Sequence, residues 1–188
     1  MSGRRLEPWE VLETEPLQDC VVFTVSRAHT RSPLTGRVHP FYRIDADAWV
    51  NVVPVTRDGS VVMVRQYRHG SQDFTLEIPG GIVDPGESPE QAAARELLEE
   101  TGYRAARLEP IGEVNPNPAL FGNRVFSFVA HAAERVDEVR NEGLEETAVE
   151  LVPAGEIPER LRRGDIDHAL VVAALYWWEL RRGGAAGP

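Results

Sequence analysis

The sequence predicts an α+β fold with one main domain and a smaller β-rich lobe at its N-terminus. A length of 188 residues suits one domain with a small accessory lobe. Runs of β-branched and aromatic residues mark several strands, and residues 89–101 carry strong helix signals. These strands and helices follow one another without regular βαβ alternation, which favours α+β over a doubly wound parallel sheet.

The N-terminal lobe is predicted from the composition of residues 7–45. Cys20–Val25 and Val38–Ile44 are rich in β-branched and aromatic residues, and Ser32–Gly36 between them has the composition of a β-turn. We therefore expect residues 1–45 to form a small antiparallel β lobe.

The main domain is predicted to start with a β-hairpin whose turn is Arg57–Ser60. A later strand is expected to end at Pro79-Gly80-Gly81, because glycines and proline interrupt strands. The strands are expected at about 49–56, 61–67, 74–78, 107–114, 124–131 and 147–152. Besides 89–101, helices are expected over Ile157–Arg163 and Ala169–Arg181, with residues 183–188 as a flexible tail.

The helix over 89–101 has a clear start and a clear end. Ser88 is a natural N-cap, and Gln91 completes a capping box with it. Pro89 occupies the first helical position, where its missing N–H costs nothing. Gly102 stands where a left-handed C-terminal residue is expected.

Composition excludes several classes of function. The formal net charge is −10, and all 20 basic residues are arginine, which argues against a nonspecific nucleic-acid binder and against lysine Schiff-base chemistry. Cys20 is the single cysteine, so an intrachain disulfide and a cysteine-rich zinc site are excluded. Residues 1–16 do not resemble a signal peptide, and the longest apolar run, 169–178, is too short to span a bilayer. We expect a cytoplasmic protein with no nucleic-acid or membrane partner.

Three acids on the first helix are the most informative feature of the sequence. Glu96, Glu99 and Glu100 are spaced so that their carboxylates share one helix face, near the end where the helix dipole disfavours negative charge. A hard divalent cation such as Mg²⁺ or Mn²⁺ would relieve both conflicts. The alternative is a solvated acidic face with an Arg95–Glu99 surface pair.

Residues around these acids match the Nudix box, G-x5-E-x7-R-E-U-x-E-E-x-G-U, and the sequence therefore resembles a Nudix hydrolase. The matching residues are Gly81, Glu87, Arg95, Glu96, Leu97, Glu99, Glu100 and Gly102. Tyr103 departs from the pattern at a packing position where an aliphatic residue is more usual. The resemblance implies a Nudix-type α/β/α sandwich with a mixed sheet over residues 46–182.

The resemblance also implies hydrolysis of a nucleoside diphosphate linked to another moiety, with Mg²⁺ or Mn²⁺ as cofactor. Carried over from the family, the metal ligands are Glu96, Glu99, Glu100 and the backbone carbonyl of Gly80, and Glu99 and Glu100 are also catalytic candidates. The remaining box residues, Gly81, Glu87, Arg95 and Gly102, would hold the loop and the helix in shape.

Residues outside the box resemble the ADP-ribose pyrophosphatase branch of the family. Val64–Arg68, Leu76–Gly81 and Pro118 carry this resemblance. Arg68 is then a phosphate-binding candidate, or else a surface arginine at a strand end. Glu77 is expected to bind metal, substrate or Arg68, or to be an ordinary strand-end acid.

Two loops supply further candidates. Asn123 and Arg124 follow a polar, proline-rich loop and could contact a ribose or sugar, or the loop could simply be rigid. In the acidic run 142–146, the resemblance favours Glu145 as the residue that activates water, with Glu142 and Glu146 as alternatives and a solvated acidic loop as the bland reading.

The N-terminal lobe resembles that branch too, where it supports a homodimer and supplies aromatics that stack on the base. Trp9 and Phe41 fall at suitable places, and ordinary packing is the alternative. The expected reaction converts ADP-ribose or a related nucleoside diphosphate sugar to a nucleoside monophosphate and a sugar phosphate. Other Nudix substrates, such as GDP-mannose or a dinucleoside polyphosphate, and a nucleotide-sugar-binding module without cleavage remain open.

Overall fold

The computed structural model describes residues 5–141 and 146–184. Its strands are β1 (Glu10–Asp19), β2 (Thr24–Arg31), β3 (Val38–Asp45), β4 (Trp49–Thr56), β5 (Ser60–Arg68), β6 (Asp73–Glu77), β7 (Gly80–Ile82), β8 (Tyr103–Arg104), β9 (Arg107–Val114), β10 (Val125–Arg135) and β11 (Thr147–Pro153). Its helices are α1 (Pro89–Thr101), the 3₁₀ turn η1 (Ala154–Glu156), α2 (Ile157–Arg163) and α3 (Ala169–Gly184). The chain divides into two compact units, residues up to 47 with 115–123, and residues 48–114 with 124 onward.

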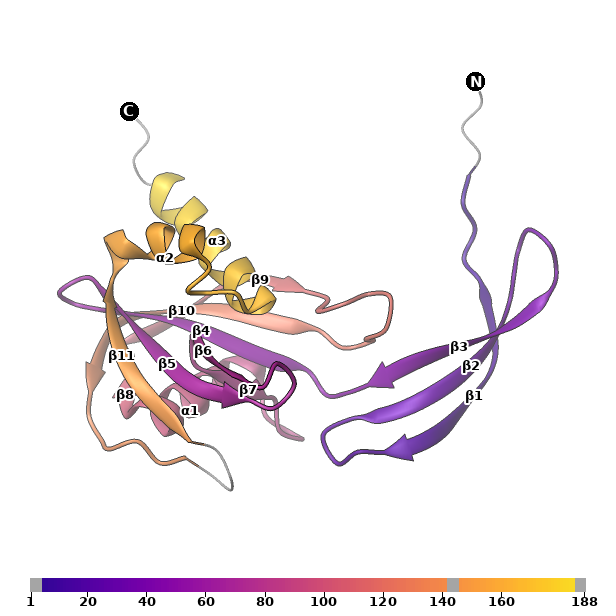
Figure 1. Ribbon diagram of the computed structural model, residues 1–188, viewed down its shortest axis with the longest axis horizontal. Helices are drawn as coiled ribbons and strands as arrows, with labels where there is room; N and C mark the ends of the chain where they lie inside the picture. The colour runs from indigo at the N-terminus through magenta and orange to yellow at the C-terminus, as the bar shows by residue number, and fades with distance from the viewer. Residues whose placement is uncertain (1–4, 142–145, 185–188) are drawn as a thin grey trace. The chain divides into compact units, whose positions relative to one another are not determined.

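The N-terminal unit contains an antiparallel sheet in the order β1-β2-β3, which confirms the predicted antiparallel lobe (Figure 1). Its β2–β3 turn forms where the composition predicted it, with Gly36 at φ 68°. Cys20–Val25 was predicted as a strand, but the Cys20 N–H donates to the Phe23 carbonyl in a turn, and the strand starts at Thr24. The sequence did not predict β1, because Glu10–Asp19 mixes charged residues and a proline with few β-branched ones.

The loop 115–123 packs with the N-terminal unit, although the sequence placed it inside the main domain. Ile44 forms a parallel bridge with Phe121, and the Ile44 N–H donates to the Leu120 carbonyl at 2.8 Å. These contacts join residues far apart in the chain, so no local pattern announced them.

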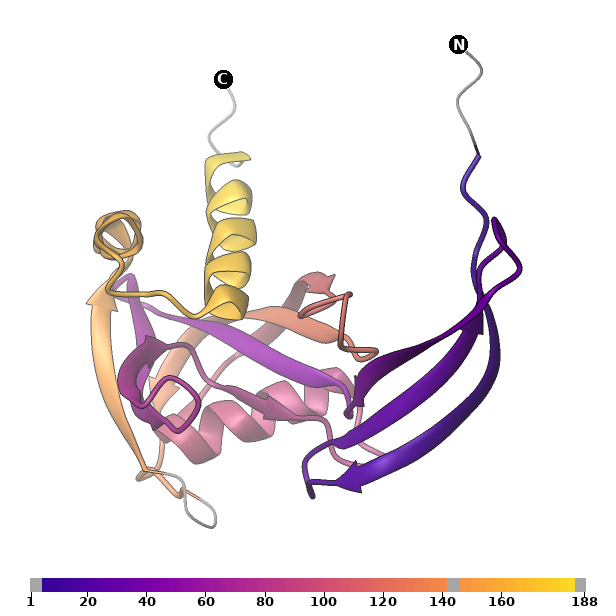
Figure 2. The same ribbon diagram turned by 45° about the vertical axis from the view of Figure 1, so that its right-hand side comes forward.

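The main unit is a mixed sheet with helices on both faces. The strand order is β11-β5-β4-β10-β8, with β6 paired to β5, β7 to β4 and β9 to β10. Only β4 and β10 run parallel among these pairs. Figure 2 shows α1 below this sheet and α2 and α3 above it. This arrangement confirms the predicted α+β sandwich.

Two apolar layers form because side chains alternate between the faces of each strand. Val52 of β4 packs with Leu97 of α1, whereas its neighbour Val53 packs with Leu175 of α3 on the other face. The α3 helix runs to Gly184, so residues 183 and 184 are helical where a tail was expected. No helix in the described ranges is both long and apolar enough to cross a membrane.

The short strand β7 shows why a glycine pair interrupts the sequence at 80–81. Gly80 pairs with Asn51, and a Cβ on Gly80 would lie 2.3 Å from the Val50 carbonyl oxygen. Only glycine allows the two backbones this close. The preceding strand was predicted to end here, and β7 was not predicted from the sequence.

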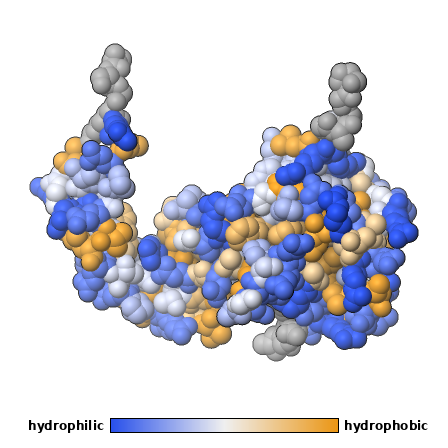
Figure 3. Space-filling model, turned by 180° about the vertical axis from the view of Figure 1, so that it is seen from behind, coloured by the Kyte–Doolittle hydropathy of each residue, from blue (hydrophilic) through white to orange (hydrophobic). Residues whose placement is uncertain are grey.

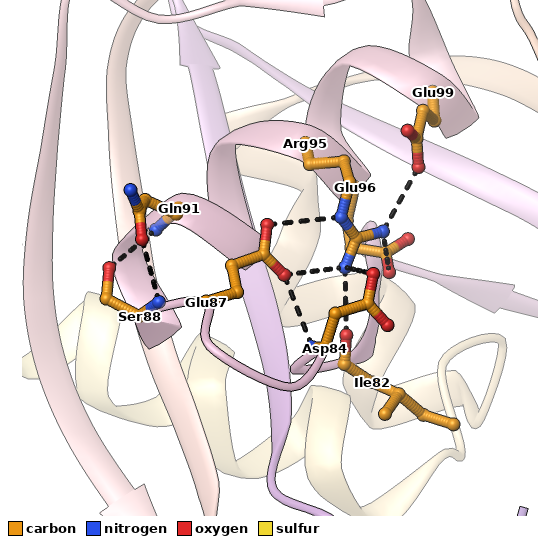
Figure 4. Close-up of polar contacts among 8 residues, drawn as sticks. All are labelled: Ile82, Asp84, Glu87, Ser88, Gln91, Arg95, Glu96 and Glu99. Atoms are coloured by element: carbon orange, nitrogen blue, oxygen red, sulfur yellow. Dashed lines mark hydrogen bonds and ion pairs between the residues drawn. The ribbon is translucent and has the colours of Figure 1, made fainter.

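The ends of α1 are held as predicted. The Ser88 Oγ accepts from the Gln91 N–H, and the Gln91 Oε1 accepts from the Ser88 N–H at 2.8 Å, which completes the capping box (Figure 4). At the other end Gly102 has φ 73°, and its N–H donates to the Leu98 carbonyl at 2.8 Å. The position of each side chain along α1 is therefore set from both ends.

The loop before α1 is tied to the helix through Arg95 and Glu87. Arg95 donates from Nε and Nη2 to the two carboxylate oxygens of Glu87 at 3.2 and 3.0 Å, and from Nη2 to the Ile82 carbonyl at 2.9 Å (Figure 4). These bonds, helped by the Asp84 N–H, lower the pKa of Glu87 below its usual 4.5.

We predict that Gly102→Ala destabilises the fold more than Gly164→Ala. Both glycines have positive φ, which costs alanine about 1 kcal/mol. Only at Gly102 would the new Cβ also collide, at 2.2 Å, with the carbonyl oxygen of Asp137. Unfolding in urea should show a loss of about 3 kcal/mol for Gly102→Ala. Equal losses at the two sites would rule out the collision.

We predict that Glu87→Gln destabilises the protein by about 1–2 kcal/mol near neutral pH, because a charge-assisted bond to Arg95 is lost. A carboxyl whose folded pKa is lowered stabilises the fold above its unfolded pKa, and this contribution disappears as the pH falls through the folded pKa. The gap in stability between wild type and variant should therefore close as the pH is lowered through the folded-state pKa of Glu87 in urea titrations. Glu156→Gln is the control, because Glu156 is exposed and, although it stands at the N-cap of α2, its side chain makes no cap hydrogen bond; this variant should show a much smaller gap.

Candidate active site

The three glutamates predicted to bind metal lie on the last turns of α1. Glu96 and Glu100 are buried, and only 4% of Glu100 is exposed. The Glu100 Oε2 accepts the Gly80 N–H at 2.9 Å, which links the helix to β7. The structure thus brings Gly80 and Glu100 together.

Gly81 makes room for the Glu96 carboxylate. A Cβ on Gly81 would lie 2.3 Å from the Glu96 Oε1 and 2.6 Å from its Cδ. Any other residue here would displace this carboxylate. The box glycine therefore shapes the acid site directly, in addition to its predicted role in the loop.

Arg95 holds two of the three glutamates. Its Nη1 donates to the Glu96 Oε1 at 2.8 Å and to the Glu99 Oε2 at 3.1 Å (Figure 4). The Arg95–Glu99 pair considered as an alternative from the sequence is therefore present. Within residues 5–141 and 146–184, no group of three or more His, Cys, Asp or Glu side chains is arranged to hold a metal ion.

The donor chemistry of the site nevertheless fits a divalent cation. Carboxylate and backbone carbonyl oxygens are the ligands that Mg²⁺ and Mn²⁺ prefer. The space kept open beside Gly81 is filled by a carboxylate and not by an apolar side chain.

The C-terminal end of α1 is bonded to the chain around the acidic run. The Arg140 N–H donates to the Glu99 carbonyl at 2.8 Å, and the Thr147 hydroxyl lies 3.1 Å from the Glu100 carbonyl. Both carbonyls are among those that a helix end leaves without an internal partner. Glu145 lies outside the described residues, as does Glu142, and Glu146 is exposed.

Arg68 and Glu77 form a two-pronged ion pair. Arg68 donates from Nε and Nη2 to the two oxygens of Glu77, each at 2.7 Å, and Thr75 donates to Glu77 at 2.6 Å. Glu77 is 3% exposed, whereas 42% of the Arg68 side chain is exposed. Burial alone would raise the pKa of Glu77, but the bonds from Arg68 and Thr75 outweigh it and lower the pKa. Of the partners considered for Glu77, the structure shows Arg68.

Arg68 lies on the α1 side of the sheet. Val62 of the same strand packs with the α1 residues in the core, and alternate residues of a strand share a face. Thr75 was not predicted from the sequence as a partner of Glu77. Its position two residues earlier on β6, hence on the same face, was the available signal.

Asn123 and Arg124, the predicted sugar contacts, belong to different units. Asn123 is buried in the N-terminal unit, where its Nδ2 donates to the Asp47 carbonyl at 2.8 Å. Arg124 in the main unit pairs with Glu113. Both side chains therefore have structural partners, and their contact with a sugar stays a prediction.

Trp9 and Phe41 lie together on the N-terminal unit. Their ring centroids are 5.4 Å apart and nearly perpendicular, and His39 adjoins Trp9. Trp9 is 44% and Phe41 48% exposed, so neither is a core residue. Figure 3 shows hydrophobic residues at the surface of this unit. Such half-exposed rings are available for a base or a protein surface.

Comparison with known proteins places these features in a family. A model of the NUDIX domain family matches residues 47–175. The ADP compounds hydrolase NudE of Escherichia coli (strain K12) is 28% identical over 180 residues, covering 93% of each chain. The ADP-ribose pyrophosphatase of Mycobacterium tuberculosis (strain ATCC 25618 / H37Rv) is 28% identical over 170 residues, covering 89% of this chain and 81% of that protein.

A further relative and a solved structure agree with these matches. The ADP-ribose pyrophosphatase of Bacillus subtilis (strain 168) is 38% identical over 91 residues, so this chain matches only about half, 49%, of that protein. The crystal structure of an ADP compounds hydrolase superposes with a TM-score of 0.87 at 24% identity, covering 98% of this chain and 99% of that one, which confirms the fold. The family model spans more than half of the sequence, and the chain therefore belongs to the NUDIX domain family.

Proposed function

We propose that the chain is a divalent-metal-dependent pyrophosphohydrolase that cleaves ADP-ribose or a related nucleoside diphosphate sugar into a nucleoside monophosphate and a sugar phosphate. The observation that carries this proposal is the acid face of α1 against the Gly80–Gly81 backbone, with buried Glu100 bonded to the Gly80 N–H. Relatives that match about nine-tenths of this chain are named for ADP-ribose and ADP compounds.

The proposed cofactor is Mg²⁺, with Mn²⁺ as the alternative. Glu96, Glu99, Glu100 and the Gly80 carbonyl would hold it. A bound cation would neutralise charge on the pyrophosphate and make water more acidic. The chain's own part is to position these carboxylates, which the Gly80 N–H does for Glu100 and the space beside Gly81 does for Glu96.

Arg68 is the proposed phosphate-binding residue. Its guanidinium is aimed by the buried Glu77, and a large part of the side chain stays exposed on the α1 side of the sheet. A planar, always charged guanidinium matches the geometry of a phosphate group. Asn123 and Arg124 are the proposed sugar contacts.

Glu145 is the proposed proton acceptor for the attacking water, and the support for it comes from the residues on either side of the acidic run. The chain on either side of the acidic run is bonded to the end of α1, through the Arg140 N–H and Thr147. Trp9 and Phe41, half-exposed on the N-terminal unit, are proposed to stack on the base or to contribute to a homodimer. The cytoplasmic location stays a prediction.

We predict that the purified protein with Mg²⁺ or Mn²⁺ hydrolyses ADP-ribose. The measurement is phosphate release after phosphatase coupling, over ADP-ribose, other nucleoside diphosphate sugars including GDP-mannose, dinucleoside polyphosphates, NADH and CoA. Fastest turnover of a dinucleoside polyphosphate would reassign the substrate class. Tight binding of ADP-ribose with no turnover of any compound would indicate a binding module and overturn the proposal.

We predict that Glu100→Gln and Glu145→Gln separate metal binding from water activation. Glu100→Gln should weaken Mn²⁺ binding and lower kcat about a hundredfold or more, since even residues behind metal ligands contribute ten- to a hundredfold. Its amide oxygen can still accept the Gly80 N–H, so the fold should persist. Glu145→Gln should lower kcat while leaving Mn²⁺ affinity unchanged.

Glu90→Gln is the matched control for both variants, because Glu90 is exposed in the first turn of the same helix. It should leave metal affinity and kcat unchanged. Full activity of Glu100→Gln would show that the acid face of α1 does not bind the metal.

A further inference from the structure

The guanidinium of Arg95 uses every donor that it has. Arginine carries five N–H donors, and the structure gives Arg95 five hydrogen bonds to the chain. Nε and Nη2 make the three bonds to Glu87 and the Ile82 carbonyl, and Nη1 makes the two bonds to Glu96 and Glu99 (Figure 4). One end of the group therefore anchors the loop, and the other end lies between two acids of α1.

The backbone that carries Glu99 is fixed. Its carbonyl accepts the Arg140 N–H at 2.8 Å, and the helix ends at Gly102, bonded to the Leu98 carbonyl. The Nε and Nη2 atoms of Arg95 are also held in place, by their bonds to Glu87 and to the Ile82 carbonyl. Of the two carboxylates bonded to Nη1, that of Glu96 is 11% exposed and lies against Gly81, whereas that of Glu99 is 26% exposed. Glu99 is therefore the side chain with more freedom to leave Nη1, and its bond of 3.1 Å is the longer of the two.

We propose that Arg95 competes with the divalent cation for Glu99. Without metal, Nη1 is the positive charge that holds the Glu99 carboxylate, and metal binding breaks this ion pair while the bonds to Glu87 and Ile82 keep Arg95 in place. The inference rests on the proposed metal-dependent function. It differs from a purely orienting role for Arg95, in which loss of the arginine could only weaken metal binding.

The competition has a measurable sign. Removing Arg95 should raise the affinity for the cation, because Glu99 is then released to bind it. Removing Glu99 as well should abolish that gain in affinity. A double-mutant cycle isolates this term from the general effect of deleting a positive charge, which is present in both backgrounds. The Arg95–Glu99 pair is partly exposed, so we expect a coupling of about five- to tenfold in affinity, between that of a surface ion pair and that of a buried charge-assisted bond.

The experiment measures Mn²⁺ and Mg²⁺ affinity by calorimetry, without nucleotide, for wild type, Arg95→Gln, Glu99→Ala and the double variant. Arg95→Gln should tighten binding about five- to tenfold more in the presence of Glu99 than in the Glu99→Ala background. Arg140→Gln, which removes an exposed arginine near the same helix end, controls for charge alone and should show no such coupling to Glu99→Ala.

A second measurement uses the unmodified protein and covers the case in which Arg95→Gln does not fold. Nitrogen NMR of the Arg95 guanidinium should show Nη1 shifting on addition of Mg²⁺, with Nε unchanged. Absence of coupling, or an Nη1 signal that ignores a bound cation, would overturn the competition. No cation binding by the wild-type protein would instead overturn the proposed metal-dependent function.

Discussion

The guanidinium of Arg95 is the interaction on which the site depends. It joins the loop before α1, the end of β7 and two glutamates of the helix with five hydrogen bonds. This positive charge between Glu96 and Glu99 offsets their repulsion at the negative end of the helix, and the third acid, Glu100, accepts the Gly80 N–H instead. The raised pKa of Arg95, caused chiefly by its bonds to Glu87, means that this charge is never lost in water.

Gly80 and Gly81, next to that network, are required for different reasons. Gly80 lets β7 approach β4, because a Cβ there would collide with backbone. Gly81 leaves space for the Glu96 carboxylate, because a Cβ there would collide with side-chain oxygens. The first glycine is required by the sheet and the second by the acid site. Backbone collisions cannot be relieved by rotating a side chain, so the two positions should differ in how they tolerate alanine.

Local signals predicted α1 from residue 89 to 101 because its cap, its first proline and its final glycine all lie within the helix or beside it. Strands β4 and β9 were equally predictable, since both have the bounds that were expected. The unpredicted parts depend on distant partners: β7 on β4, and residues 115–123 on Ile44. For Glu77 the sequence offered several partners, and the structure shows Arg68. In the site, spacing identified the acid face and offered the Arg95–Glu99 pair as an alternative, and the structure adds that the same Arg95 nitrogen also bonds Glu96.

Because α1 is fixed at both ends, the number of residues between its caps determines which way its side chains face. Each residue of an α-helix turns the chain by about 100°, so one residue inserted after Arg95 would rotate Glu99 and Glu100 away from Gly80 while both caps stayed intact. The thirteen-residue length of α1 thus sets the position of the acids relative to the Ser88 cap and the sheet. We therefore expect α1 to tolerate substitutions on its outer face. Insertions and deletions within the helix should disrupt the site, even where the inserted residue is an excellent helix former.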